Sequence, residues 1–352
     1  MQLNQLRHIY EAEGPCATVY LEARSPSEDA EHQVRLRWDD LKSQLADAGT
    51  HEEALSALES AIITEDIGGV QAEGRVLVAD RSGLLLEEHF DAAAGTGDRA
   101  VFGEPAELGA YIRERLRAVR VLVAIADQES AVLRRLVLTA SDVHAEGAEE
   151  HVSGSAGESV HKPRQNALKH KQIQRTADEA AKRNLREVSE RLRSVAAAWR
   201  PDVIAVAGEV QGRKLLLEEL PHELKEVADE LEAGGGIPSG SADEGVEHAL
   251  AEELGTLART ITIERARTHT ERYGEARSAG RSAEGADRVR AAARLGAVDT
   301  LLLRYDRRAE DEDELLGAAA GVDAAVGLVG TEVEGDVAAV LRYEAPVEDV
   351  TA

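Results

Sequence analysis

The chain has 352 residues, with 41 Lys and Arg against 67 Asp and Glu, and its formal net charge is −26. At about 150 residues per domain, this length predicts two or three domains. The single cysteine, Cys16, excludes an internal disulfide framework and a zinc site built on cysteines. So acidic a chain is not a general polyanion binder, and any contact with nucleic acid requires a local basic patch.

No stretch of the sequence predicts a membrane segment. The apolar runs, such as residues 121–126, are far shorter than the ~20 residues that span a bilayer. The first residues do not combine a charged start with an apolar core, as a secretory signal would. We therefore expect a cytoplasmic protein without a membrane partner.

Residues 1–117 are expected to form an N-terminal α/β domain. In chain order the patterns predict a short helix at 3–10, a strand at 17–21, an amphipathic stretch at 34–45, a strand at 75–79, a second strand at 84–86 and a helix at 108–119. The turn residues at 80–83 predict that the second and third of these strands form a hairpin.

Residues 118–260 are expected to form a middle domain. Strands at 119–126 and 132–138 precede a polar, Gly- and Ser-rich stretch, and the basic loop is placed at 145–171. A long helix at 166–199 ends before Pro201, because proline cannot continue a helix. A strand at 203–207 and a helix that opens at 215 complete the domain.

Residues 261–352 are expected to form a C-terminal α/β domain. A helix from about 246 runs into it, and a helix at 286–295 precedes strands at 300–303, 325–329 and 337–343. The acidic run at 310–314 is expected to be a solvated loop. Helices and strands alternate here and in the middle domain, which predicts a mixed α/β (α+β) chain of three domains.

Charge is unevenly distributed along the chain. Residues 161–200 contain 11 basic and 4 acidic residues, and 161–175, the basic segment, contains no acidic residue at all. Such a stretch favours contact with RNA phosphates. The predicted RNA-binding residues are His161, Lys162, Arg164, Gln165, Lys169, His170, Lys171 and Arg175. From Asp178 onward we expect a solvated helix with pairs such as Arg183–Glu187 and Arg186–Glu190.

Common catalytic and cofactor motifs are absent from the sequence. It contains no phosphate loop, no dinucleotide fingerprint and no H-E-x-x-H helix. Residues 154–157 lack the spacing of a nucleophile elbow. Cys16 beside Pro15 is expected to be a buried, inert thiol. We therefore expect no cofactor and no metal, with a metal site at 310–314 as a minor alternative.

Three stretches together resemble a known family. They are 121–138 (VLVAIADQESAVLRRLVL), 161–220 (beginning HKPRQNALKHK), and 291–303 (AAARLGAVDTLLL) with 336–343 (DVAAVLRY). Their order and spacing resemble the middle and C-terminal domains of archaeo-eukaryotic class 1 release factors and Pelota. The stretch LRHIYEAEGPCATVYLEARS resembles the bacterial branch of that superfamily, which includes actinobacterial dormancy-associated proteins and the hibernation factor Balon.

The resemblance implies a fold and a place of action. The middle domain would be RNase-H-like, and the C-terminal domain would resemble the kink-turn-binding ribosomal-protein fold. The chain would occupy the ribosomal A site, with loop 161–171 directed toward the rRNA of the peptidyl-transferase centre and the N-terminal domain near the decoding centre. An elongation-factor GTPase is a further implied partner, and DNA is not.

One departure from the family bears on catalysis. Release factors carry Gly-Gly-Gln before the long helix, where this chain has Pro163, Arg164 and Gln165. Proline fixes φ and removes an N–H, whereas glycine allows positive φ. We therefore expect a non-catalytic ribosome-binding factor in hibernation or rescue. The alternatives are a peptidyl-tRNA hydrolase or RNA-cleaving enzyme that uses Gln165, and a protein–protein adaptor.

Overall fold

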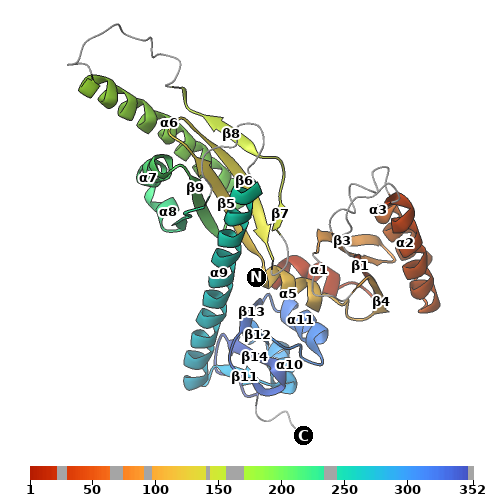
Figure 1. The fold of residues 1–352 in the computed structure, drawn as a ribbon. Coiled ribbons are helices and arrows are strands. Elements are labelled where there is room, and N and C mark those ends of the chain that lie inside the picture. Colours follow the sequence, from red (N-terminus) through yellow and green to blue (C-terminus); the bar gives the residue numbers. More distant parts are fainter. Residues whose placement is uncertain are drawn as a thin grey trace. The chain divides into compact units, whose positions relative to one another are not determined.

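The computed structural model describes residues 1–21, 30–63, 74–90, 97–139, 143–155, 170–233 and 244–347. The described residues form three sheets, one in each of the predicted domains, and the predicted mixed α/β class is confirmed (Figure 1). By residue contacts the chain divides into two compact units. Met1–Arg117 with Ile263–Ala352 form the first unit, and Ala118–Thr262 form the second. The limits of the three domains stay a prediction.

The N-terminal sheet of the first unit is antiparallel, in the order β3-β2-β1-β4. Its strands are β1 (Cys16–Leu21), β2 (Arg75–Asp80), β3 (Gly83–His89) and β4 (Arg99–Gly103). Helices α2 (Ala30–Asp47) and α3 (Glu52–Ile62) cover one face, and Trp38 and Leu58 pack there against Val19 and Leu77. The β2–β3 hairpin is the one that the turn residues predict.

The opposite face of this sheet shares a core with the C-terminal half of the chain. Side chains alternate between the faces of a strand, so that Tyr20 and Val76 face this second core. The segments η1 (Leu3–Leu6), α1 (Arg7–Tyr10) and α5 (Gly109–Arg117) contribute Leu3, Ile9 and Ile112 to it. Residues far apart in the sequence thus form one hydrophobic core.

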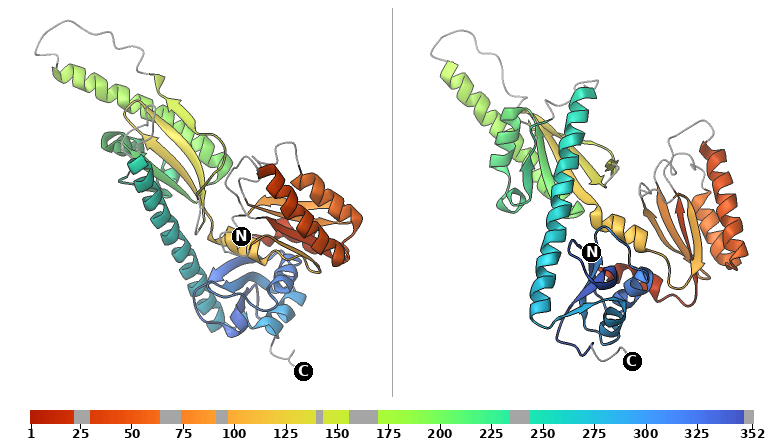
Figure 2. Two further views of the ribbon diagram at one scale, coloured as in Figure 1. Left: turned by 45° about the vertical axis from the view of Figure 1, so that its right-hand side comes forward. Right: turned by 60° about the horizontal axis from the view of Figure 1, so that its bottom comes forward.

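The C-terminal sheet has the order β11-β14-β12-β13. Its strands are β11 (Ser282–Glu284), β12 (Val298–Arg304), β13 (Ala325–Val329) and β14 (Val337–Leu341). Leu301 and Leu303 pack with α10 (Ala286–Arg294) and α11 (Glu312–Ala320), whereas Leu302 packs with Tyr273 on α9 (Glu244–Ser278). Helices therefore cover both faces of this sheet (Figure 2).

The second unit contains a sheet in the order β10-β9-β5-β6-β7, with β8 also paired to β6. Its strands are β5 (Val119–Ala126), β6 (Ser130–Leu138), β7 (Val143–Ala145), β8 (Glu150–Ser153), β9 (Val203–Gly208) and β10 (Ala228–Glu230). Strand β5 is antiparallel to β6 and parallel to β9. This order is that of an RNase-H-like sheet, as the resemblance implies.

Helices cover both faces of this sheet as well. On one face α6 (His170–Trp199), α7 (Val210–Glu219) and α8 (His222–Lys225) pack with Leu122 and Ala124 of β5. On the other face Val121 and Val123 pack with Leu250 and Leu254 of α9. A strand buried on both faces is apolar, which is why residues 121–126 of β5 and 203–207 of β9 are continuous apolar runs.

Two expectations for the middle domain are wrong. Part of the polar stretch placed in a loop at 145–171 forms strand β8, which pairs with β6 from Ser130↔Ser153 to Leu133↔Glu150. Its residues are half-buried or exposed, so no apolar run marks it. Helix α7 begins at Val210, five residues before the predicted start at 215. Residues 210–214 (VQGRK) contain a glycine and three polar residues, so no apolar pattern marks this first turn in the sequence.

Two glycines allow α7 to lie close to the end of β5. A Cβ on Gly208, whose φ is +107°, would be 2.3 Å from the carbonyl oxygen of Ala126. A Cβ on Gly212 would be 2.6 Å from the backbone carbonyl carbon of Asp127. Real Cβ atoms do not approach backbone so closely, so that a larger residue at either position would push the helix away from the strand.

Replacing Gly212 by alanine is expected to destabilise the second unit. Alanine usually favours a helix over glycine, but here its methyl group would overlap the backbone of Asp127. We expect the free energy of unfolding to fall by about 1–3 kcal/mol. Denaturation followed by Trp199 fluorescence in a Trp38→Phe background measures it, since these are the chain's two tryptophans and Trp199 belongs to the second unit.

The matched control is Gly274→Ala in α9, where a new Cβ would meet no atom within 4 Å. It is expected to stabilise the first unit by about 0.5–1 kcal/mol, as a glycine-to-alanine change in an unhindered helix does. Trp38 fluorescence in a Trp199→Phe background reports on that unit. If Gly212→Ala and Gly274→Ala change the free energy of unfolding of their units equally, the close approach of Gly212 to Asp127 is contradicted.

Candidate functional site

Most of the predicted RNA-binding residues lie outside the described part of the chain. Those that fall within 156–169 are His161, Lys162, Arg164, Gln165 and Lys169. His170, Lys171 and Arg175 lie on α6, where the described ranges include the backbone but not these side chains. The RNA-binding assignments therefore stay predictions, and the described residues on either side of 156–169 are Ser155 and His170.

Gly154 lies directly against α6 at the end of β8. A Cβ there would be 2.3 Å from the Cβ and 2.4 Å from the Cα of Asn184. The Gly154 N–H donates a hydrogen bond of 3.0 Å to the carbonyl oxygen of Glu129, in the turn between β5 and β6. Its φ lies outside the left-handed region, so the close approach to the helix is what requires a glycine here.

The next residue, Ser155, is bound to α6 by two hydrogen bonds. Its N–H donates to one carboxylate oxygen of Glu187 (3.0 Å), and its hydroxyl donates to the other (2.5 Å). The hydroxyl bond and then the amide bond lower the pKa of Glu187, and the charge of Arg183 lowers it further. Hydrogen bonds to an ionised carboxylate are stronger than those between neutral groups. The chain is thus attached to α6 immediately before residues 156–169.

A second contact lies one turn further along α6. The Arg191 guanidinium donates to both carboxylate oxygens of Glu150 on β8, with Nη2 at 2.9 Å from Oε2. This pairing lowers the pKa of Glu150. Glu187 and Arg191 are four residues apart and therefore lie on the same side of the helix. Strand β8 and Ser155 together contact one stripe of α6.

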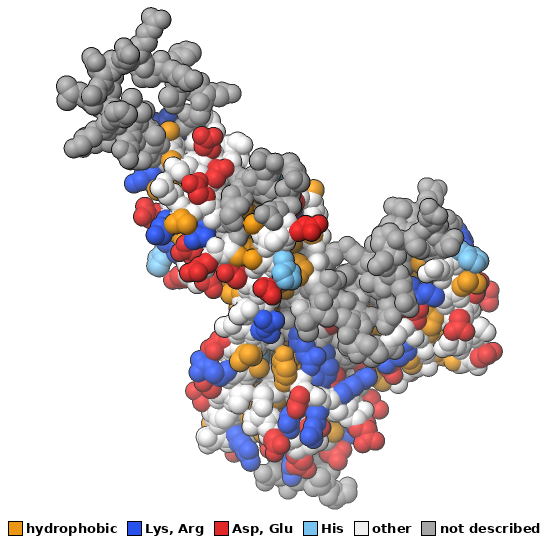
Figure 3. All heavy atoms as spheres, in the orientation of Figure 1, with side chains coloured by type: hydrophobic (Ala, Val, Ile, Leu, Met, Phe, Trp, Pro, Cys, Tyr) orange, Lys and Arg blue, Asp and Glu red, His pale blue; other side chains and the backbone are white. Residues whose placement is uncertain are grey.

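The charged face of α6 is paired differently from the prediction. Arg186 pairs with Glu219 of α7, with Nε 3.1 Å from Oε2, and Glu190 pairs with Arg193. The predicted Arg186–Glu190 pair is therefore wrong. Arg186, Glu190 and Arg193 are exposed, which agrees with the expectation of a solvated helix face with interleaved charges. Acidic and basic side chains are likewise mixed over the visible surface in Figure 3.

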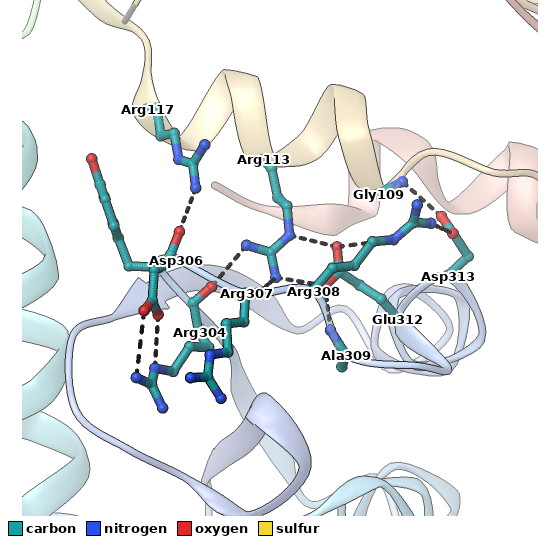
Figure 4. Close-up of polar contacts among 11 residues, drawn as sticks. Gly109, Arg113, Arg117, Arg304, Asp306, Arg307, Arg308, Ala309, Glu312 and Asp313 are labelled. Carbon is teal, nitrogen blue, oxygen red and sulfur yellow. Dashed lines mark hydrogen bonds and ion pairs between the residues drawn. The ribbon is translucent and has the colours of Figure 1, made fainter. Parts of the chain in front are cut away.

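A buried ion pair joins the two halves of the first unit (Figure 4). Arg113 of α5 donates from Nε and Nη2 to the two carboxylate oxygens of Glu312, at 2.7 and 2.6 Å. Its remaining donors bind backbone carbonyl oxygens, that of Arg304 at 2.7 Å and that of Arg307 at 2.6 Å. The Glu312 side chain is 0% exposed, so this charge is balanced only from within the protein.

Neighbouring contacts support this pair. The Gly109 N–H donates to Asp313 at 2.6 Å, and Arg308 also pairs with Asp313. Burial raises the pKa of Asp313, and the Arg308 charge opposes that effect. The Arg117 guanidinium lies 4.9 Å from the ring centre of Tyr305. Helix α5 is therefore held along its length against the 304–313 region.

The expectation of a solvated loop at 310–314 is wrong. Helix α11 begins at Glu312, inside the acidic run, and Glu312 is buried. The physical reason is Arg113, which lies 199 residues earlier in the sequence. Acidic residues in a first helical turn are also favoured by the helix dipole.

A groove of about 420 Å³ lies on the first unit between α9 and the ends of β12 and β13. It is lined by Ile263, Ala266, Arg267, Thr270, Tyr305, Asp306 and Gly330. The charged residues at its edge are neutralised locally, Arg267 by Glu264 and Asp306 by Arg304. Nothing in its lining indicates a charged ligand.

In the described ranges, no group of three or more His, Cys, Asp or Glu side chains could hold a metal ion. No described helix combines the length and apolar character needed to cross a bilayer. Cys16 is buried as predicted, and burial, with the charges of Asp80 and Glu104, raises the pKa of its thiol to about 11. At neutral pH the thiol is therefore protonated and a poor nucleophile.

Truncating Arg113 is expected to destabilise the first unit strongly. Arg113→Ala leaves the Glu312 carboxylate buried without a balancing charge, which costs about 3–5 kcal/mol. Replacing both partners with apolar residues, Arg113→Met with Glu312→Leu, should restore much of this stability. Trp38 fluorescence during chemical denaturation measures both changes.

The control for this prediction is Arg7→Ala. Arg7 pairs with Glu11 and Asp323 on the surface, where its side chain is 39% exposed. Exposed pairs contribute about 0–1 kcal/mol. If Arg113→Ala lowers the free energy of unfolding by as little as Arg7→Ala does, the Arg113–Glu312 pair does not hold the unit together.

Curated relatives are found in Mycobacterium tuberculosis. The uncharacterized proteins Rv2629 of strain H37Rv and MT2704 of strain CDC 1551 are each 29% identical to this chain over 308 residues. Each alignment covers 86% of this chain and 78% of the relative.

Solved structures with similarity to this chain include several translation factors. Dom34 of S. cerevisiae is 11% identical with a TM-score of 0.44, covering 96% of this chain and 97% of its own. Archaeoglobus fulgidus Pelota is 16% identical with a TM-score of 0.36, covering 99% and 92%. The archaeal termination factor aRF1 is 18% identical with a TM-score of 0.26, covering 96% of each chain.

A family model matches nearly all of the second unit and the whole of α9. Residues 120–279 match bacterial archaeo-eukaryotic release factor family 2. This range contains the RNase-H-like sheet and α6, the elements on which the resemblance of residues 121–138 and 161–220 rests. Residues 120–279 are therefore similar to the bacterial archaeo-eukaryotic release factor family 2.

Proposed function

We propose that this protein is a ribosome-binding translation factor that occupies the A site and does not catalyse peptide release. The observation that carries the proposal is the placement of the basic segment within the release-factor-like range 120–279. This segment has five Lys or Arg residues and no acid, in a chain of net charge −26. Such a local excess of cations suits rRNA phosphates and not a protein surface of mixed charge.

The proposed role is in hibernation or rescue, with an elongation-factor GTPase as a possible carrier. This part of the proposal is supported by the resemblance to the bacterial branch of the superfamily that includes Balon. In this proposal, the basic segment contacts rRNA near the peptidyl-transferase centre. The contacting residues are His161, Lys162, Arg164, Lys169, His170, Lys171 and Arg175.

The proposed absence of catalysis depends on Pro163, Arg164 and Gln165. Without the two glycines, the backbone beside the glutamine loses positive-φ conformations, and at Pro163 it also loses an N–H. A second function, peptidyl-tRNA hydrolysis, is favoured by one observation, the retention of Gln165. The third, a protein–protein adaptor, would be indicated by partners that bind independently of salt and include no ribosomal component.

Reversing two charges in the basic segment is expected to weaken ribosome binding. In Lys162→Glu with Lys169→Glu, two phosphate contacts are lost, so the slope of log affinity against log salt should decrease by about 1.4–1.8. Co-sedimentation with 70S ribosomes across a salt series measures both the affinity and the slope.

The matched control is Lys214→Glu with Lys225→Glu, which makes the same change in net charge on α7 and α8 of the same unit. Lys214 is exposed, and Lys225 donates only to the backbone oxygen of Glu218. Affinity and slope should stay near those of the unaltered chain. If the two double variants lose affinity for 70S ribosomes equally, the loss is a general effect of net charge. That result would contradict the assignment of the phosphate contacts to the basic segment.

Release of labelled peptide from ribosome-bound peptidyl-tRNA tests catalysis directly. The proposal predicts no release above background by either the unaltered chain or Gln165→Ala. A rate above background that Gln165→Ala abolishes would establish the hydrolase alternative. Restoring Gly-Gly by Pro163→Gly with Arg164→Gly provides a positive comparison, because these changes return the backbone freedom that the family motif has.

A further inference from the structure

We infer that the groove on the first unit, between α9 and the ends of β12 and β13, is a binding site for an uncharged nucleoside. This site goes beyond the proposed function and does not depend on ribosome binding. The residues that line it are all described and all belong to the first unit. The place of the groove in the sheet, its walls and the pairing of its charged side chains each point to such a ligand.

The groove lies at the carboxyl ends of two parallel strands. Strands β12 and β13 are paired in parallel as far as Arg304 and Val329. Tyr305 and Asp306 follow directly after β12, and Gly330 follows directly after β13. In open α/β sheets, small ligands bind in the crevice outside the carboxyl ends of the strands. The volume of about 420 Å³ lies within the range of about 300–1,000 Å³ that is typical of such sites.

Hydrogen bonds hold the walls of the groove in place. The Gly330 N–H donates to Thr270 Oγ1 at 3.1 Å, which ties the end of β13 to α9. The Thr270 hydroxyl donates in turn to the carbonyl oxygen of Ala266 at 2.7 Å. The Tyr305 N–H donates to the carbonyl oxygen of Val329 at 3.0 Å, which ties the ends of the two strands together. The groove is therefore formed before a ligand enters, and a preformed site loses less affinity to ordering.

An aromatic ring and aliphatic side chains suit the groove to a flat, uncharged ring. Tyr305 lines the groove, and the guanidinium carbon of Arg117 lies 4.9 Å from the centre of its ring. Arg117 also donates to the carbonyl oxygen of Tyr305, so this residue is held at both its ring and its backbone. Ile263, which is 65% exposed, and Ala266 add apolar surface from α9. Bases stack on aromatic side chains, because every base has a π face.

The charged side chains of the lining are already paired with opposite charges. Arg267 pairs with Glu264 at 2.6 Å and with Glu271 at 3.0 Å. Asp306 accepts a hydrogen bond of 2.8 Å from Nε of Arg304 (Figure 4). A phosphate group would have to compete with these carboxylates for the two arginines, in a chain of net charge −26. The groove therefore favours a nucleoside over the corresponding nucleotide.

Asp306 supplies a polar contact that selects a base with an amino group. An ionised carboxylate has about four lone-pair sites, and Arg304 donates two hydrogen bonds to them. The remaining sites can accept N–H groups, such as the amino group of adenine or cytosine. We therefore expect adenosine to bind more tightly than purine riboside, which is the same molecule without the amino group.

Calorimetric titration of the full chain with adenosine tests the site. We expect a Kd on the order of 0.1 mM, which the binding efficiency of ligands of this size allows. Tyr305→Ala should weaken binding by about five- to 100-fold through the loss of stacking. Tyr305→Phe keeps the ring and should bind as the unaltered chain does.

Two related ligands test the chemistry of the site. Adenosine monophosphate and purine riboside should each bind more weakly than adenosine. Asp306→Ala should remove the difference between adenosine and purine riboside, because the carboxylate that accepts from the amino group is gone.

Two further variants separate binding from folding. Ala266→Phe places a large side chain in the groove without removing a side-chain contact, so it should abolish binding while chemical denaturation shows a folded first unit. Tyr343→Ala removes a tyrosine of the same unit that is 47% exposed and is not part of the groove lining. This control should bind adenosine as the unaltered chain does.

Several results would overturn the inference. The first is the absence of measurable adenosine binding at concentrations well above the expected Kd. Unchanged binding by Ala266→Phe, or equal weakening by Tyr305→Ala and Tyr343→Ala, would place the nucleoside outside the groove. Tighter binding of adenosine monophosphate than of adenosine would contradict an uncharged ligand, and equal binding of purine riboside would contradict the contact assigned to Asp306.

Discussion

The paired charges of Arg113 and Glu312 are the constraint on which the first unit depends. Residues 118–262 are inserted between the two parts of that unit, so its halves are separated by the whole second unit in the sequence. Arg113 lies five residues before the insertion, and its guanidinium donates to Glu312 and to the backbone carbonyl oxygens of Arg304 and Arg307. A buried charge pair of this kind tolerates little change in geometry, because neither charge has water to replace a lost partner.

The second unit uses its charged groups differently. Its contacts between β8 and α6 are at least partly exposed and contribute little to stability. They attach β8 and Ser155 to α6. The acidic remainder of the chain opposes contact with RNA elsewhere.

The sequence predicts the elements that are continuous in apolar character. Apolar runs or apolar periodicity predict strands β1, β5 and β9, the β2–β3 hairpin and α6. Burial of one or both faces of an element requires apolar residues at regular positions in its sequence. Strand β8 leaves no such pattern, since its Glu150 and Ser153 lie at a half-exposed edge. The burial of Glu312 could not be predicted, because its partner is distant in the sequence. The basic segment was identified from charge, but its attachment through Gly154 and Ser155 depends on a helix face some 30 residues away.

The central claim is that this chain occupies the ribosomal A site. The most direct test is co-sedimentation with 70S ribosomes whose A site is either empty or filled with aminoacyl-tRNA, at one low salt concentration. The account predicts that the chain binds the empty ribosomes and is excluded from the filled ones. Equal binding to both, or binding to neither, would contradict it.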